Sequence, residues 1–176
     1  MSDRSPDAPA QILVADDVEM NRDLLARRVR RLSHEVLVAV DGRQALEVLR
    51  ERPVDVLLLD IMMPNMNGYE VLEAMAADER LRHVPVIMIS AIDEKESIAR
   101  CIELGADDYL PKPFDPLILQ ARLGASLARK RLREREQAER RAEERSTALY
   151  RFTRALLASA SLHDAVRAVV TQIRES

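Results

Sequence analysis

The chain has 176 residues and a net charge of −3, with 47% hydrophobic residues, 3% aromatic residues and no tryptophan. This length suits one ordinary domain with an extension, and its core has to be aliphatic. The single cysteine, Cys101, excludes an internal disulfide and a cysteine-rich metal site. No apolar run approaches the ~18 residues of a membrane span, so we expect a cytoplasmic protein without a membrane partner.

Strand-like and helix-like patterns alternate along the chain after a leader, 1–9, that we expect to be disordered. Short apolar runs predict strands, and apolar residues at helical spacing predict the helices between them. From residue 115 onward the pattern is helical throughout. The predicted strands are 11–15, 35–40, 54–60, 84–90 and a short one within 107–113; the predicted helices are 17–32, 43–52, 68–81 and 94–104.

Five strand–helix repeats with continuously apolar strands predict an α/β domain, residues 10–126. Its parallel sheet is covered by helices on both faces, which makes it a doubly wound (βα)5 fold. Right-handed crossovers bring the carboxyl ends of the strands to one edge, where such sheets bind ligands. We therefore expect the functional site at that edge.

Polar side chains occur where four of the predicted strands end. Asp60 closes an apolar strand that offers its charge no partner, although an unpaired buried charge is costly. The sequence places the other polar residues at the same edge: Asp16, Asp17, Ser90 and Lys112. Three carboxylates brought together repel one another, and oxygen ligands of this kind suit Mg²⁺. With an ammonium and a hydroxyl added, the set matches what a transferring phosphoryl group needs.

These residues and their surroundings resemble the receiver domains of two-component response regulators. The resemblance rests on the pair Asp16-Asp17 and on the segments "LLLDIMMPNMNG", "MISA" and "DDYLPKPF". It implies a flavodoxin-like strand order, 2-1-3-4-5, and a sensor histidine kinase or phosphotransfer protein as the phosphoryl donor. It also implies no enzymatic activity beyond the domain's own phosphorylation and dephosphorylation.

The resemblance further implies a role for each site residue. Asp60 is the phosphoacceptor, Lys112 and Ser90 contact the phosphoryl group, and Tyr109 is the aromatic switch that moves inward with Ser90. Asp17, Asp60 and the backbone carbonyl of Met62 bind Mg²⁺ directly, and Asp16 acts mainly through water. Receivers generally have a cis bond before the proline that follows the lysine, so we expect a cis Lys112–Pro113 bond.

Two other classes share features with this pattern. A dinucleotide-binding enzyme needs a glycine-rich turn after its first strand, but the turn here is "ADDVEMN". A phosphohydrolase of the haloacid dehalogenase type needs a second aspartate two residues after the nucleophile, but that position is Met62. Both alternatives are therefore rejected.

Residues 127–158 are predicted to be a helical linker. Across 129–145 it has 13 charged residues in 17 and lacks glycine and proline. Glutamates interleave with the arginines without aromatic neighbours, which argues against nucleic-acid binding. One heptad seam predicts a coiled coil and a homodimer, with an isolated solvated helix as the alternative. The seam consists of Ala125, Ala128, Leu132, Arg135, Glu139, Ala142, Ser146 and Leu149.

Residues 159–176 are predicted to begin a second helix or a truncated output domain. Ser159 to Ser161 interrupts the apolar pattern, and Ser161 with Asp164 resembles a capped helix start. The segment around it weakly resembles a GAF sensory domain, and the receiver-like part resembles those that precede nucleotide cyclases or serine phosphatases. An alternative is a kinase-associated receiver with His163 as a second phosphoacceptor on a dimerising helix.

Overall fold

The computed structural model describes residues 9–91 and 95–174, with side chains described for 9–91 and 97–154. The leader predicted for 1–9 lies outside these residues except for its last position, and the side chain of His163 lies outside them as well. The strands are β1 (Gln11–Ala15), β2 (Glu35–Ala39), β3 (Val56–Asp60), β4 (Val86–Ser90) and β5 (Asp108–Pro111). The helices are α1 (Glu19–Arg31), α2 (Gly42–Glu51), α3 (Gly68–Ala77), α4 (Lys95–Glu103) and α5 (Pro116–Arg174).

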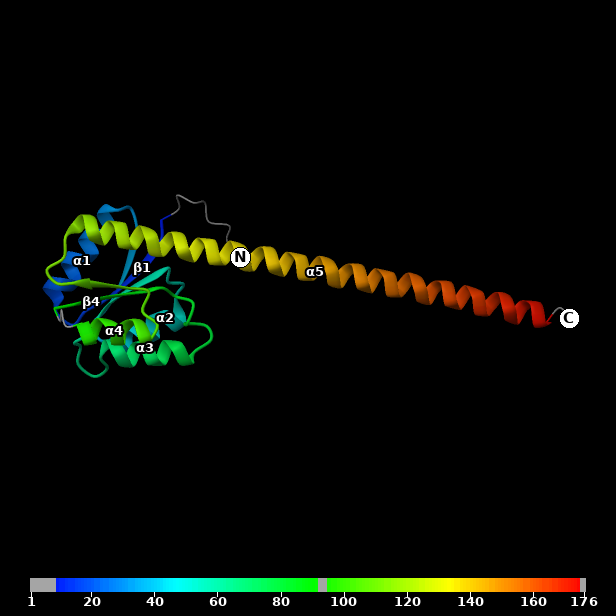
Figure 1. Ribbon diagram of the computed structural model, residues 1–176, viewed down its shortest axis with the longest axis horizontal. Helices are drawn as coiled ribbons and strands as arrows, with labels where there is room; N and C mark the ends of the chain where they lie inside the picture. The colour runs from blue at the N-terminus through cyan, green and yellow to red at the C-terminus, as the bar shows by residue number, and fades with distance from the viewer. Residues whose placement is uncertain (1–8, 92–94, 175–176) are drawn as a thin grey trace. The chain divides into compact units, whose positions relative to one another are not determined.

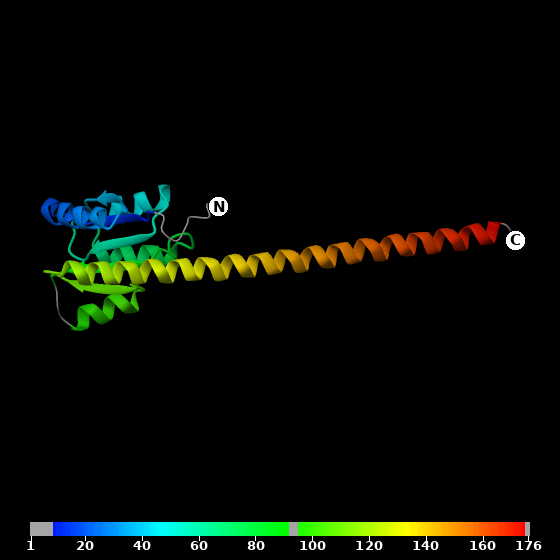
Figure 2. The same cartoon turned by 90° about the horizontal axis from the view of Figure 1, so that it is seen from above.

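The five strands form one parallel sheet in the order β2-β1-β3-β4-β5, as predicted. Helices α1 and α5 cover one face, and α2, α3 and α4 cover the other (Figures 1 and 2). The central strand, β3, is buried along its whole length because both its neighbours and both helix layers cover it. The edge strand β2 is only partly buried, so its sequence tolerates Glu35 among the valines.

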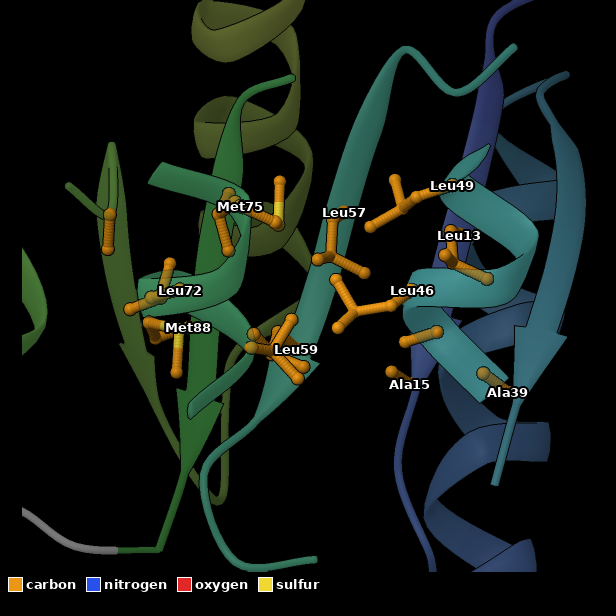
Figure 3. Packing of buried hydrophobic residues seen from close by; sticks show 14 of the residues in the cluster. Leu13, Ala15, Ala39, Leu46, Leu49, Leu57, Leu59, Leu72, Met75 and Met88 are labelled. Carbon is orange, nitrogen blue, oxygen red and sulfur yellow. The ribbon is translucent and has the colours of Figure 1, made fainter. Parts of the chain in front are cut away.

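Alternation along the strands divides the aliphatic core into two layers. Leu13, Leu57 and Leu59 point toward α2 and α3, where Leu46 and Leu72 meet them (Figure 3). The strand residues between them point to the opposite face and pack against α1 and the first part of α5. Successive side chains of a strand point to opposite faces of the sheet, so each continuous apolar run contributes to both core layers.

The first part of α5 packs on the sheet through one stripe of side chains. Leu119, Leu123 and Leu127 are spaced four residues apart and are almost fully buried. Such spacing keeps side chains on one face of a helix. Lys130, in the next turn, donates to the backbone carbonyl of Val54 and forms an ion pair with Asp55, just before β3.

The expected interruption at Ser159–Ser161 is wrong, because α5 continues without a break to Arg174. Neither glycine nor proline occurs after Gly124, and serine costs only fractions of a kcal/mol in a helix. The Ser161–Asp164 motif can cap a helix only where the chain enters from a non-helical conformation, and here it does not. The chain divides into two compact units, residues 1–131 and 132–176. Among the described residues, no helix has the length and apolar character needed to cross a membrane.

Candidate phosphoryl-transfer site

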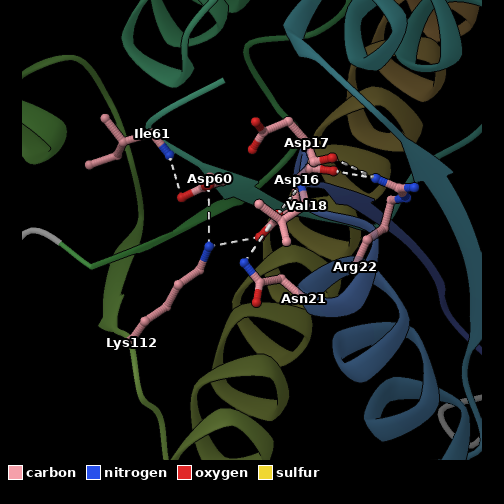
Figure 4. Close-up of polar contacts among 8 residues, drawn as sticks. All are labelled: Asp16, Asp17, Val18, Asn21, Arg22, Asp60, Ile61 and Lys112. Carbon is pink, nitrogen blue, oxygen red and sulfur yellow. Dashed lines mark hydrogen bonds and ion pairs between the residues drawn. The ribbon is translucent and has the colours of Figure 1, made fainter. Parts of the chain in front are cut away.

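The charged residues singled out in the sequence meet at the carboxyl edge of the sheet (Figure 4). Asp16 follows β1, Asp60 is the last residue of β3, and Lys112 follows β5. Ser90 is the last residue of β4. Asp16, Asp60 and Ser90 are buried, with exposed fractions of 0%, 7% and 1%. Parallel strands bring these side chains together because all of them end at the same edge.

Lys112 supplies the positive charge of the site. Its Nζ lies 2.7 Å from Asp16 Oδ2 and 3.2 Å from Asp60 Oδ2, so one ammonium bridges two carboxylates. The other oxygen of Asp60 accepts a hydrogen bond from the backbone N–H of Ile61 at 2.9 Å. Asp60 is therefore fixed by contacts on both its oxygens.

The acidic cluster carries more negative charge than Lys112 neutralises. Carboxylate oxygens of Asp16, Asp17 and Asp60 lie within 4.8 Å of one another. Burial raises the pKa of Asp60 above its ordinary value, the Lys112 ammonium opposes this shift, and the nearby Asp16 charge adds to it. Three carboxylates facing one ammonium leave an excess of negative charge and several oxygen donors, which together suit a divalent cation.

Two side chains and one backbone N–H that the sequence did not single out hold the acidic pair in place. Arg22 donates from Nη1 to the backbone carbonyl of Asp16 at 2.7 Å and to that of Asp17 at 3.4 Å. Asn21 donates to Asp16 Oδ1 at 3.4 Å, and the N–H of Val18 donates to the same oxygen at 2.9 Å. The pattern of α1 alone does not distinguish Arg22 from the other arginines of that helix.

The loop between β3 and α3 begins directly at Asp60 and is tightly folded. The N–H of Gly68 donates to the carbonyl of Ile61 at 2.8 Å and closes the loop at its base. A Cβ at Gly68 would lie 2.4 Å from the carbonyl oxygen of Asp60, so only glycine fits there. Asn67 and Glu70 then form a capping box that starts α3. Met62, whose carbonyl the resemblance assigns to the cation, lies in this loop with its side chain 64% exposed.

Ser90, Tyr109 and Lys112 lie on or next to the paired strands β4 and β5. The carbonyl of Ser90 accepts a hydrogen bond from the N–H of Lys112 at 2.7 Å. Tyr109 is 6% exposed and belongs to the core layer beneath α2, α3 and α4. The Lys112–Pro113 bond is cis, as expected. The structure thus brings Asp16, Asp17, Asp60 and Lys112 into one cluster and places Ser90 at the end of the strand next to β3.

Comparison with known proteins agrees with this arrangement. The family model of the response regulator receiver domain matches residues 12–124. The chain belongs to this family. It is 39% identical over 136 residues to the response regulator PleD of Caulobacter vibrioides, an alignment that covers 75% of this chain and 30% of PleD. A probable transcriptional regulator of Guillardia theta is 39% identical over 119 residues, which cover 68% of this chain and 46% of that protein. The receiver-family chain thus spans less than half of either relative.

Solved receiver structures have the same fold. Chemotaxis protein CheY4 of Vibrio cholerae superposes with a TM-score of 0.65 at 30% identity, covering 68% of this chain and 100% of CheY4. The receiver domain of sensor histidine kinase PA1611 from Pseudomonas aeruginosa, solved with magnesium in its active-site cleft, also gives a TM-score of 0.65 at 30% identity. That alignment covers 69% of this chain and 99% of the PA1611 receiver.

Proposed function

We propose that this receiver accepts a phosphoryl group on Asp60 from the phosphohistidine of a sensor kinase or phosphotransfer protein. The P–N bond to the donor imidazole breaks, and a bond forms between phosphorus and a carboxylate oxygen of Asp60. The observation that carries the proposal is the environment of Asp60, a buried carboxylate bridged by Lys112 to Asp16 with Asp17 alongside. A carboxylate so placed is a nucleophile beside a preformed set of charges for phosphoryl oxygens.

The donor set fits Mg²⁺, which Asp17, Asp60 and the carbonyl of Met62 would hold, with Asp16 acting through water. Bound there, the ion would neutralise charge on the phosphoryl oxygens. Lys112 would bind one of these oxygens while remaining close to Asp16, and the Ser90 hydroxyl would bind another. The presence of magnesium in the related PA1611 receiver supports this assignment.

We further propose that phosphorylation is relayed through α5 to an output domain, with two copies of the chain paired along that helix. Ser90 and Tyr109 would carry the change, because Tyr109 lies on β5 beside Met88 of the strand that ends at Ser90. The continuity of α5 from the sheet to Arg174 supports a mechanical connection. The heptad seam supports a second copy as its partner.

Labelling with radioactive acetyl phosphate tests the proposal. The wild-type chain should incorporate label only when Mg²⁺ is present, and Asp60→Asn should remain unlabelled, since the amide cannot form the acyl phosphate. Asp23→Asn, a substitution at an exposed position of α1, is the matched control and should label like wild type. Equal labelling of Asp60→Asn and wild type would overturn the assignment.

A further inference from the structure

The loop that carries Met62, residues 61–67, has an irregular conformation that needs support. Asn65 adopts a φ of 63°, in the left-handed region that costs a non-glycine residue free energy, although asparagine tolerates it better than most. Within the loop, the N–H of Met66 donates to the carbonyl of Pro64 at 2.6 Å. The N–H of Gly68 closes the base of the loop by donating to the carbonyl of Ile61.

The tip is fastened to a segment distant in sequence, the turn between β2 and α2. Asn65 Nδ2 donates to Asp41 Oδ2 at 2.8 Å, across 24 residues of sequence. Beside it, the N–H of Gly42 donates to the carbonyl of Met66 at 3.2 Å. A Cβ at Gly42 would lie 2.5 Å from that carbonyl oxygen, so the two backbones meet as closely as glycine allows. We call Asp41 and Asn65 the loop clamp.

The carboxylate of Asp41 divides its two oxygens between separate tasks. Oδ1 accepts from the N–H of Gln44 at 2.8 Å and caps the start of α2, and Oδ2 accepts from Asn65. These two donors, the Gln44 N–H first, hold the pKa of Asp41 below its ordinary value. The carboxylate therefore remains ionised at neutral pH and keeps both contacts. A simple helix cap uses one oxygen, whereas this residue also joins two loops.

We infer that Asp41 and Asn65 are positioning residues of the phosphorylation site, which hold the loop of Met62 so that its carbonyl meets the same cation as Asp17 and Asp60. The inference rests on the proposed function, since it assigns the clamp to that site. A backbone carbonyl has no rotamers, so its direction is set entirely by the loop that contains it. Groups that orient metal ligands without touching the metal commonly change its affinity about tenfold or more. The clamp acts on the loop rather than on the ligand itself, so a smaller effect of about three- to tenfold is expected.

Two substitutions separate the clamp from the helix cap. Asp41→Ser retains a capping oxygen for α2 and removes the second oxygen that Asn65 needs. Asn65→Gly keeps the positive φ and removes the amide. Titration calorimetry of the full chain with MgCl₂ should give a dissociation constant about three- to tenfold weaker for each variant. The double variant should bind Mg²⁺ no more weakly than the single variant with the larger dissociation constant, because both substitutions remove the same interaction.

The rate of phosphorylation should change only through the affinity for Mg²⁺. In acetyl phosphate labelling, both variants should need more Mg²⁺ for half-maximal rate and should recover nearly the wild-type rate at saturating Mg²⁺. Asp78→Ser is the matched control. Asp78 also accepts a backbone hydrogen bond, from the N–H of Arg80 at 3.0 Å, but it lies at the other end of α3 from the loop. The substitution should leave the affinity for Mg²⁺ unchanged.

The outcomes distinguish the clamp from the site it serves. If Asp41→Ser and Asn65→Gly lower the melting temperature but bind Mg²⁺ like wild type, the contact stabilises the fold only, and the inference is wrong while the proposed function stands. If wild type itself neither binds Mg²⁺ nor becomes labelled, both are wrong. Weakened Mg²⁺ binding in both variants with an unchanged Asp78→Ser control supports the clamp.

Discussion

The ammonium of Lys112 lies between Asp16 and Asp60, at 2.7 Å from one carboxylate and 3.2 Å from the other. The same charge that would attract phosphoryl oxygens therefore occupies space near the proposed cation. A fixed ammonium repels Mg²⁺, and it favours an incoming phosphoryl group with its negative oxygens. Lys112 should consequently have opposite effects on the two ligands.

Lys112→Met tests this opposition, because methionine fills similar space without the charge. Mg²⁺ should bind the variant more tightly, by about three- to tenfold, since one repulsive charge has been removed. Phosphoryl uptake from acetyl phosphate should slow by about 100-fold, since a charged donor to the transferring group has been lost. Calorimetry and labelling measure the two effects, with Lys130→Met as a lysine control remote from the cluster. Unchanged uptake would place Lys112 outside the reaction.

The other end of β3 suggests a second experiment. Lys130 on α5 lies 2.7 Å from Asp55 Oδ1, and the two side chains are only 16% and 24% exposed. Asp55 Oδ2 accepts the N–H of Gln11 at 2.8 Å, so this ion pair joins α5 to both β1 and β3. β3 therefore begins next to the Lys130–Asp55 ion pair and ends at Asp60.

Lys130→Met should lower the free energy of unfolding in urea by about 1–3 kcal/mol, the usual cost of losing a charged hydrogen bond that is largely shielded from water. Hydrogen exchange of the amides in 124–131 should become faster, because the helix loses the ion pair and hydrogen bond that fasten it to the residues just before β3. Arg135→Met, at an exposed position of the same helix, is the control. If stability and exchange both remain at wild-type values, the ion pair is incidental.

The sequence predicted the sheet, and the meeting of its acidic residues with Lys112 at one edge, for a common physical reason. Val56–Asp60 is continuously apolar up to one aspartate, and such a strand has a stable place only at the centre of a covered sheet with its charge at the edge. The same reasoning placed Ser90 and Lys112. Contacts that depend on loop conformation, such as Asp41 with Asn65, were not predictable, because neither residue forms a periodic pattern and they lie 24 residues apart.

The prediction for the end of the chain was wrong for a related reason. The interrupted apolar pattern and the Ser161–Asp164 cap motif predict a break at Ser159–Ser161, although α5 is continuous there. Serine starts a helix well when a preceding residue leaves the helical conformation, but it does not itself force that departure. A break needs glycine, proline or a tertiary contact, and the sequence after Gly124 has neither of the first two.

His34 gives the domain a predicted pH dependence of stability. Its Nδ1 accepts the N–H of Ala10 at 3.4 Å, which requires an unprotonated nitrogen. Burial, followed by the charge of Arg131, lowers the pKa of His34, and Asp55 opposes the shift. Between the ordinary histidine value near 6.5 and the lowered folded value, the unfolded chain binds the proton and the folded chain does not. Stability from this group is therefore complete above about pH 6.5 and declines as the pH falls through that window.

His34→Asn retains an acceptor for Ala10 and cannot titrate. Between pH 7 and pH 5 the melting temperature of wild type should fall by ~1–2 °C more than that of the variant. His83→Asn, at an exposed position, should follow the wild-type profile. Parallel curves for wild type and His34→Asn would show that this histidine does not contribute.

The heptad seam of α5 is placed so that a second copy could pack on it. All eight of its positions, from Ala125 to Leu149, are exposed, whereas the sheet is covered by Leu119, Leu123 and Leu127. Ala125 is two residues from both Leu123 and Leu127, which is about 200° around an α-helix. The seam therefore begins on the side of α5 turned away from the sheet. Large apolar side chains are left in water on this helix, including Leu132 at 58% and Leu149 at 66% exposure.

We predict that residues 1–176 form a parallel dimer at tens of micromolar and that residues 1–131 are monomeric, since the shorter chain keeps the Lys130 contact but loses most of the seam. Sedimentation velocity of both chains measures this directly. Leu132→Glu with Leu149→Glu should dissociate the long chain, because like charges would face each other at two seam positions without any change at the sheet. Ser146→Cys should form a disulfide between copies under oxidation, because a parallel, in-register pair brings the two introduced cysteines together. An antiparallel pair whose centre lies away from residue 146 keeps them apart. If the long chain sediments as a monomer, α5 is a single-helix spacer, and the signal from Asp60 has to pass along one copy alone.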